Sequence, residues 1–156
     1  MSGDPGKDGV AGPAVSSSET ILHASCVALG GKGLLILGAS GSGKSGLALS
    51  LMAMGAALVA DDRVVLTRSQ NRVVASVPRQ LAGIIEARGI GLLTADTCGS
   101  ANVVCVVDLN QCEDSRMPPP RQTELLGQFF PLLFKVDAPH FPPALIQYLK
   151  QGRRPE

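Results

Sequence analysis

The chain has 156 residues and a formal net charge of +1 at pH 7, so its composition gives no reason to expect a nucleic acid or an anionic membrane as partner. No apolar run reaches the roughly 18 residues that a membrane-spanning helix needs, and no charged start followed by an apolar block marks a secretory leader. The four cysteines form no C-x-x-C pair and only two histidines are present, so we expect free thiols in a reducing cytoplasm rather than a zinc site.

The first part of the chain is predicted to be a polar tail followed by a β-hairpin. Residues 1–20 are mainly Gly, Pro, Ser and Ala, with too little apolar surface to fold, so we expect a disordered tail there. Residues 21–29 alternate weakly and predict a strand, and the glycines of residues 30–33 predict a turn. The apolar run at residues 33–37 then predicts a buried strand.

Directly after that strand comes the sequence GASGSGKS, which fits the phosphate-binding loop pattern of two glycines, four free positions between them, then Lys and Ser. Apolar residues at helical spacing over residues 46–54 predict that the loop opens a helix, with Gly55 as its C-cap. Such a loop turns backbone N–H groups toward phosphate oxygens, and the helix N-terminus adds partial positive charge. We expect Lys44 to contact the β- and γ-phosphates and Ser45 to bind Mg²⁺. The predicted nucleotide-binding residues are Gly38, Ala39, Ser40, Gly41, Ser42, Gly43, Lys44 and Ser45.

The middle of the chain is predicted to be rich in strands. Residues 57–60 indicate a short buried strand, and residues 63–77 indicate a β-hairpin that Pro78 ends. Residues 81–85 predict a helical turn or short helix. Residues 103–109 give the clearest buried strand of the chain.

The C-terminal third is predicted to hold a loop, an interrupted apolar run and a helix. Residues 113–120 are polar and rich in proline, which favours a loop. The apolar run at residues 129–136 is broken by Pro131, and the prolines at residues 142 and 143 open a helix that reaches Lys150. We expect one domain over residues 21–152, followed by a short tail over residues 153–156.

Carboxylates at the ends of buried strands are the candidate metal ligands. Asp61 and Asp62 follow the strand at residues 57–60, and Asp108 lies at the end of the strand at residues 103–109. A carboxylate in such a place beside a phosphate loop commonly holds Mg²⁺, directly or through water. Spacing alone does not choose between the two positions.

Four features in order make the sequence resemble the catalytic domain of HPr kinase/phosphorylase, a family that phosphorylates a serine of HPr, the phosphocarrier of bacterial sugar phosphotransferase systems. They are His23, fifteen residues before the phosphate loop; the loop itself; the sequence ADDRV at residues 60–64; and the sequence IEARGIG at residues 85–91. The resemblance covers residues 23–109 and continues more weakly to residue 136. It implies an α/β fold in which the phosphate loop lies on a mixed β-sheet.

The resemblance also implies roles for single residues. Lys44 would contact the transferred group, and Ser45 and Glu86 would be Mg²⁺ ligands. Asp62 would take the proton of the attacking serine, with Asp61 beside the metal or tuning Asp62. His23 would lie near the transferred phosphoryl group, and Arg116 would stabilise transition-state charge.

The function that the resemblance implies is an ATP- and Mg²⁺-dependent protein-serine kinase acting on HPr or an HPr-like carrier. The family's basic segment for the reverse dephosphorylation has no counterpart in residues 137–142, so kinase activity is the main expectation, with the reverse reaction and a homo-oligomer left open. Two alternatives remain: a P-loop ATPase or small-molecule kinase that uses Asp108 as its metal carboxylate, and a non-catalytic module that senses ATP.

Overall fold

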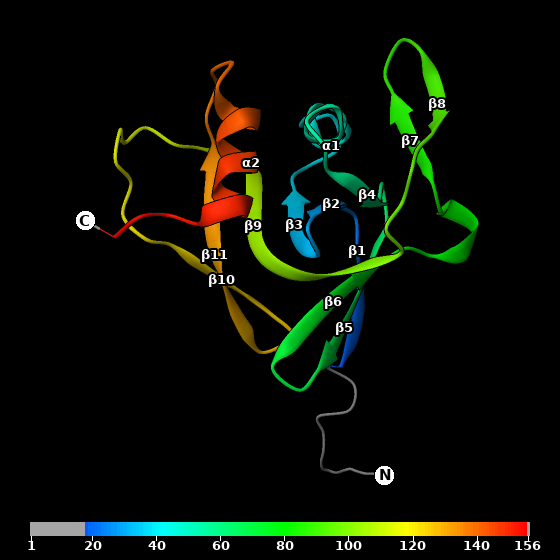
Figure 1. Cartoon of the computed structure of the whole chain (residues 1–156), viewed down its shortest axis with the longest axis horizontal. Coiled ribbons are helices and arrows are strands. Elements are labelled where there is room, and N and C mark those ends of the chain that lie inside the picture. The colour runs from blue at the N-terminus through cyan, green and yellow to red at the C-terminus, as the bar shows by residue number, and fades with distance from the viewer. Residues whose placement is uncertain (1–17, 156) are drawn as a thin grey trace.

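The computed structural model describes residues 18–155, which form a mixed β-sheet, two α-helices and a separate β-hairpin (Figure 1). The expected tail over residues 1–20 lies outside the described residues except at its end, where Glu19 and Thr20 belong to the first strand. The strands of the large sheet are β1 Glu19–Leu22, β2 Ser25–Leu29, β3 Lys32–Leu37, β4 Ala57–Ala60, β5 Val64–Ser69, β6 Arg72–Ser76, β9 Ser100–Cys112, β10 Gln122–Leu125 and β11 Gln128–Lys135. The remaining elements are α1 Lys44–Ala53, the 3₁₀ turn Arg79–Leu81, β7 Ile84–Ala87, β8 Gly91–Thr94 and α2 Phe141–Gln151.

The large sheet has the strand order β1-β5-β6-β9-β3-β2-β4, with β11 and β10 joined to it through β9. Strand β9 pairs in parallel with both β3 and β11, whereas the other pairs are antiparallel. The expected α/β fold with a mixed β-sheet is therefore confirmed. No helix within residues 18–155 is long and apolar enough to cross a membrane.

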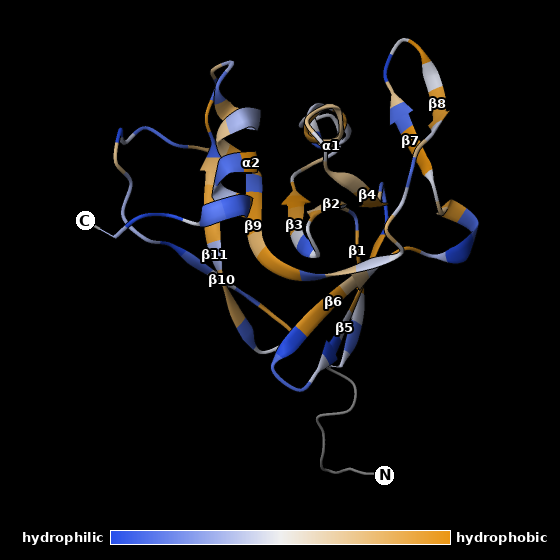
Figure 2. Ribbon diagram, in the orientation of Figure 1, coloured by the Kyte–Doolittle hydropathy of each residue, from blue (hydrophilic) through white to orange (hydrophobic). Residues whose placement is uncertain are grey.

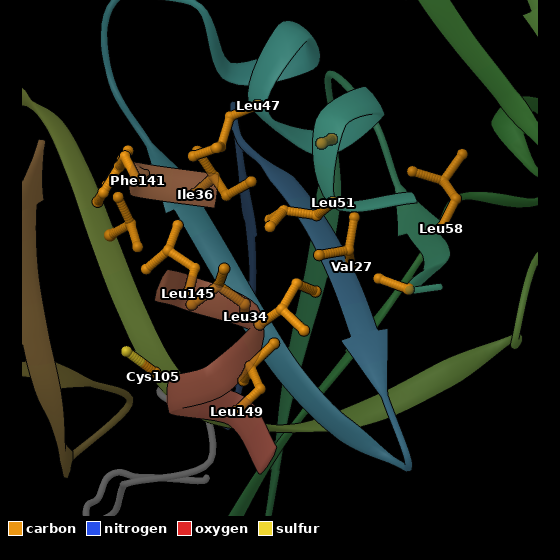
Figure 3. Close-up of a cluster of buried hydrophobic side chains, with 14 of the residues drawn as sticks. Val27, Leu34, Ile36, Leu47, Leu51, Leu58, Cys105, Phe141, Leu145 and Leu149 are labelled. Carbon is orange, nitrogen blue, oxygen red and sulfur yellow. The ribbon is translucent and has the colours of Figure 1, made fainter. Parts of the chain in front are cut away.

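The central strands are apolar on both faces, and alternate side chains enter two separate cores. Leu34 and Ile36 of β3 pack against α1 and α2, in the cluster drawn in Figure 3. Leu35 enters the second core, where β4 meets Val73 and Ala75 of β6. Because β4 and β6 are not neighbours in the strand order, the sheet must curl so that its β5–β6 end covers the face that lacks helices. The ribbons of β3 and β9 are largely orange in Figure 2, as strands buried on both faces should be.

Two of the predicted elements need correction near the site. The expected strand over residues 21–29 is interrupted at His23 and Ala24, so that β1 pairs with β5 while β2 pairs with β3 and β4. The helix expected over residues 81–85 is wrong, because Ile84 and Ile85 belong to strand β7. Gly83, at φ 72°, ends the turn, and the two isoleucines then alternate between 36% and 1% exposure, the period of a strand.

Pro131 does not break its apolar run, because β11 continues through it to Lys135. Pro131 lies opposite Gln122 of β10. The amide of the next residue, Leu132, donates to the carbonyl of Arg121, so the nitrogen of Pro131 falls between ladder hydrogen bonds. Pairing of β11 with β9 begins only at Leu132. Strand β10 itself was missed, since its sequence QTEL carries almost no apolar signal.

Candidate functional site

The phosphate loop joins the end of β3 to the start of α1, as expected from the sequence. Gly43 precedes the helix at φ 101°, a backbone conformation that a residue with a Cβ rarely adopts. Gly38 lies in a crowded place, since a Cβ there would come within 3.1 Å of the Ser42 Cβ and 3.2 Å of the Leu109 Cβ. The amide of Ala39 donates to Oδ1 of Asn110 at 3.0 Å, so the neighbouring strand β9 holds the start of the loop in place.

Lys44 is the first residue of α1 and is only 7% exposed. Its Nζ donates to the carbonyl oxygens of Gly38 at 2.8 Å and Ala39 at 3.0 Å. The side chain therefore curls back over the loop, and its ammonium group lies where the loop amides and the helix N-terminus also concentrate positive charge.

Asp61 is buried behind the loop and connects three segments of the chain. Its Oδ1 accepts hydrogen bonds from the hydroxyls of Ser25 and Ser45, both at 2.7 Å, and its Oδ2 accepts from the amide of Glu86 at 3.2 Å. These donors replace water around the carboxylate and so make its burial tolerable.

Asp62 is the neighbour of Asp61 but has a different setting. Its backbone is left-handed, with φ 72°, and its side chain is 59% exposed. Asp62 Oδ1 lies 3.0 Å from Nε2 of His23, a residue from the break between β1 and β2. The predicted Asp pair is thus divided into a buried carboxylate at Ser45 and an exposed one at His23.

A cavity of about 470 Å³ lies in front of the loop and α1. Of the predicted site residues, it is lined by His23, Ser40, Gly41, Gly43, Lys44, Ser45, Asp62 and Glu86. It is also lined by residues that were not predicted: Ser25, Gly46, Leu49 and Arg88. Gly38, Ala39, Ser42 and Asp61 lie behind this surface, in the loop and at its rear.

Asp108 and Arg116 do not line the cavity. Asp108 is opposite Leu37 in the β3–β9 pair, at the edge where the loop begins, but its Oδ1 accepts from the amide of Asn110 at 2.9 Å. Arg116 is exposed in the loop between β9 and β10. The ion pair between Glu113 and Arg121 joins the two ends of that loop. Partial burial tends to raise the pKa of Glu113, but hydrogen bonds from Ser115 and Arg121 outweigh it and hold this pKa below its usual value.

The family model for the HPr serine kinase C-terminal domain matches residues 15–111, more than half of the chain. The chain belongs to this HPr kinase family. Among relatives named HPr kinase/phosphorylase, it is 43% identical to that of Clostridium botulinum over 75 residues and 45% identical to that of Lactobacillus acidophilus over 73 residues. The matches cover 48% and 46% of this chain but only 25% and 23% of those proteins. The chain therefore spans about a quarter of the length of these relatives.

The fold agrees with the family assignment. The structure described as the Hpr(Ser) kinase/phosphatase from Coxiella burnetii aligns with a TM-score of 0.69 and 26% identity, covering 85% of this chain and 94% of that chain. The recognition of the HPr kinase family from four short sequence features is confirmed.

Sequence reasoning missed two polar residues of the site. Ser25 stands alone among apolar neighbours in β2, and this was the signal that could have drawn attention to it. Arg88 lies within the family-like sequence at residues 85–91, yet its place on the cavity wall depends on the β7–β8 hairpin, which was not predicted.

Proposed function

We propose that this chain is an ATP- and Mg²⁺-dependent protein kinase that phosphorylates a serine of HPr or an HPr-like phosphocarrier. The observation that carries the proposal is one cavity lined by Lys44, Ser45 and the exposed carboxylate of Asp62. These are the groups that phosphoryl transfer requires: a phosphate contact, a metal ligand and a proton acceptor.

The phosphate loop would bind the triphosphate of ATP. Lys44 would exchange its bonds to the Gly38 and Ala39 carbonyls for bonds to phosphate oxygens, which are stronger because both partners are charged. The amides at the start of α1 would donate to the same group. Arg88 adds a guanidinium on the opposite wall.

The residues present fit a magnesium ion. The Ser45 hydroxyl donates a hydrogen bond to Asp61, which leaves an oxygen lone pair for a cation on the cavity side, and Glu86 supplies a carboxylate. Mg²⁺ prefers oxygen ligands, and it is usually coordinated by one or two protein groups together with substrate phosphates. When bound, it would offset phosphate charge during transfer. Asp61 would act beside this ion by fixing Ser45.

Asp62 would be the general base. Oδ1 is held by His23, while Oδ2 lies 3.9 Å from Nε of Arg63, which is beyond hydrogen-bond distance, so Oδ2 can accept the proton of the substrate serine. The serine oxygen then forms a bond to the γ-phosphorus while the bond from that phosphorus to ADP breaks. In the reverse reaction with inorganic phosphate, Asp62 would return the proton to the serine. His23 limits the rotation of the carboxylate and lies next to the transferred group.

The carrier protein would dock across the mouth of the cavity. Arg116 is exposed in the loop that follows β9 beyond Asp108, the partner of Leu37 where the phosphate loop begins. Phe129, at 63% exposure, precedes Leu132, the partner of Val106, and therefore lies toward the other end of the sheet. Under this proposal Arg116 would contribute its charge after the partner binds, since it does not line the cavity of the free chain.

The test is incubation with purified HPr, ATP and Mg²⁺, followed by mass analysis for phosphoserine. We expect one phosphate on HPr, and none when Mg²⁺ is replaced by EDTA. Phospho-HPr incubated with inorganic phosphate tests the reverse reaction. ATP consumed without phosphorylation of HPr would instead favour an ATPase that uses Asp108, and ATP bound without being consumed would favour a sensing module.

A further inference from the structure

Ser25 is the one fully buried serine among the residues that the structure describes, at 0% exposure in β2. Its hydroxyl donates to Asp61 Oδ1 at 2.7 Å, the same oxygen that accepts from Ser45 at 2.7 Å. A buried hydroxyl without a partner is costly, so this contact fixes the rotamer of Ser25 as well as that of Asp61.

The two serines together use up the acceptor capacity of Asp61 Oδ1. A carboxylate oxygen has two lone pairs, and each is occupied by one hydroxyl. The other oxygen, Oδ2, is turned toward the amide of Glu86. Asp61 therefore has no free lone pair on the oxygen next to Ser45, and the Ser45 proton has one defined direction, away from the cavity.

We infer that Ser25 is a positioning residue for the divalent cation: it pins Asp61 so that Asp61 acts through the Ser45 hydroxyl and does not bind the ion with Oδ1. Without Ser25, one lone pair of Oδ1 would be free and the carboxylate could rotate. The Ser45 proton would then lose its fixed direction, and the oxygen that faces the cavity would be a poorer ligand. Residues that orient a ligand in this way commonly change metal affinity by roughly 10- to 100-fold when they are replaced.

The inference depends on the proposed function for the identity of the ligand, but its test does not depend on transfer to HPr. The probe is Mn²⁺, whose binding to the full chain in the presence of ADP is followed by electron paramagnetic resonance. We expect Ser25→Ala to raise the dissociation constant of Mn²⁺ about tenfold. Binding of ADP without a divalent cation, followed by calorimetry, should change less than about twofold, because the Ser25 hydroxyl donates to Asp61 and so has no proton left to donate to a phosphate.

Two further variants separate positioning from packing. Ser25→Thr keeps the hydroxyl and should restore Mn²⁺ affinity to within about twofold of the original chain, since a strand tolerates a β-branched residue. Ser76→Ala, a half-buried serine of β6 away from the cavity, is the matched control and should bind Mn²⁺ normally. If Ser25→Ala does not fold, Ser25→Cys, which keeps the size but donates weakly, takes its place.

Three results would overturn the inference: an unchanged Mn²⁺ affinity in the variant without the hydroxyl, an equal loss of ADP binding with and without the cation, or no Mn²⁺ binding by the original chain. A chain that binds Mn²⁺ and ADP but does not phosphorylate HPr would overturn the proposed function alone, and the comparison of Ser25 variants would stand.

Discussion

The two walls of the cavity in front of α1 are built in different ways. One wall is the phosphate loop, held between β3 and α1 of the main body by Asp61 and Asn110. The other is the hairpin of β7 and β8, which forms a sheet of its own and lies beside α1 in Figure 1. The hairpin contributes Glu86 and Arg88, and it contacts the core mainly through Ile85 and Ala87.

Because the two walls differ in how they are held, we expect them to contribute differently to ligand binding. A two-stranded hairpin is at best marginally stable alone, so the position of Glu86 depends on packing against the body and on the bond from its amide to Asp61. The phosphate loop, in contrast, lies between strand β3 and helix α1, both of which contribute buried side chains to one core. We expect phosphate binding to be robust, and binding of the cation and closure of the site to be sensitive to the hairpin.

The largest effect is expected from Asp62→Asn, which leaves both walls intact. Asparagine tolerates the left-handed backbone at φ 72° but cannot take the serine proton. Removing a general base typically lowers the rate by roughly 100- to 10,000-fold. The rate of HPr phosphorylation is measured together with ATP affinity, which should not change. Asp137→Asn, an exposed change elsewhere, is the control, and a fully active Asp62→Asn would refute the proposed base.

Ile85→Ala tests whether the hairpin of β7 and β8 can be destabilised without destabilising the main sheet. Ile85 is 1% exposed in the core beside α1, and such truncations typically cost about 2–5 kcal/mol. Hydrogen exchange should accelerate most in β7 and β8. Leu51→Ala, a fully buried change in α1, should instead accelerate exchange throughout the sheet. Identical exchange patterns in the two variants would mean that the two walls unfold as one unit.

Glu86→Gln removes one charge from the hairpin wall and should raise the Mg²⁺ concentration needed for half-maximal transfer by roughly tenfold, since the carboxylate is a proposed ligand. A titration of activity with Mg²⁺ at saturating ATP measures this, with Glu124→Gln on the exposed face of β10 as the matched control. Equal Mg²⁺ requirements in the two variants would exclude Glu86 as a ligand.

The smallest expected effect is a difference in the rate at which the cysteine thiols are modified, and it compares the hairpin with the sheet without a mutation. Burial raises the pKa of Cys105 to about 12 and also raises the pKa of Cys26, whose thiol is buried in the sheet. Cys98 follows the hairpin, is exposed, and has a pKa raised by partial burial. A thiol with a raised pKa holds less reactive thiolate near pH 8. A thiol-specific reagent should therefore modify Cys112 first, then Cys98, and the two buried thiols only on unfolding. Rapid reaction of Cys105 would show that the sheet core opens readily.

Local patterns predicted the secondary structure of the loop wall well and that of the hairpin wall poorly. The loop, α1 and β4 follow from glycine spacing and apolar periodicity that lie within a few neighbouring residues. The residues at 81–85 fit a helix as well as a strand, and pairing with β8 decided the outcome. The contact of His23 with Asp62 spans 39 positions, so only the resemblance to a family brought these residues together. The role of Ser25 depends on which face of β2 meets Asp61, which the sequence does not encode locally.

The left-handed backbone at Asp62 has an evolutionary consequence. Asparagine and aspartate are both enriched in this backbone shape, and of these two only aspartate carries a carboxylate that can accept a proton. Under the proposed function, a single nucleotide change that turns Asp62 into asparagine would preserve the fold and ATP binding while ending phosphoryl transfer. A lineage could therefore pass from catalyst to ATP-dependent signal in one step, with no structural intermediate to be selected against.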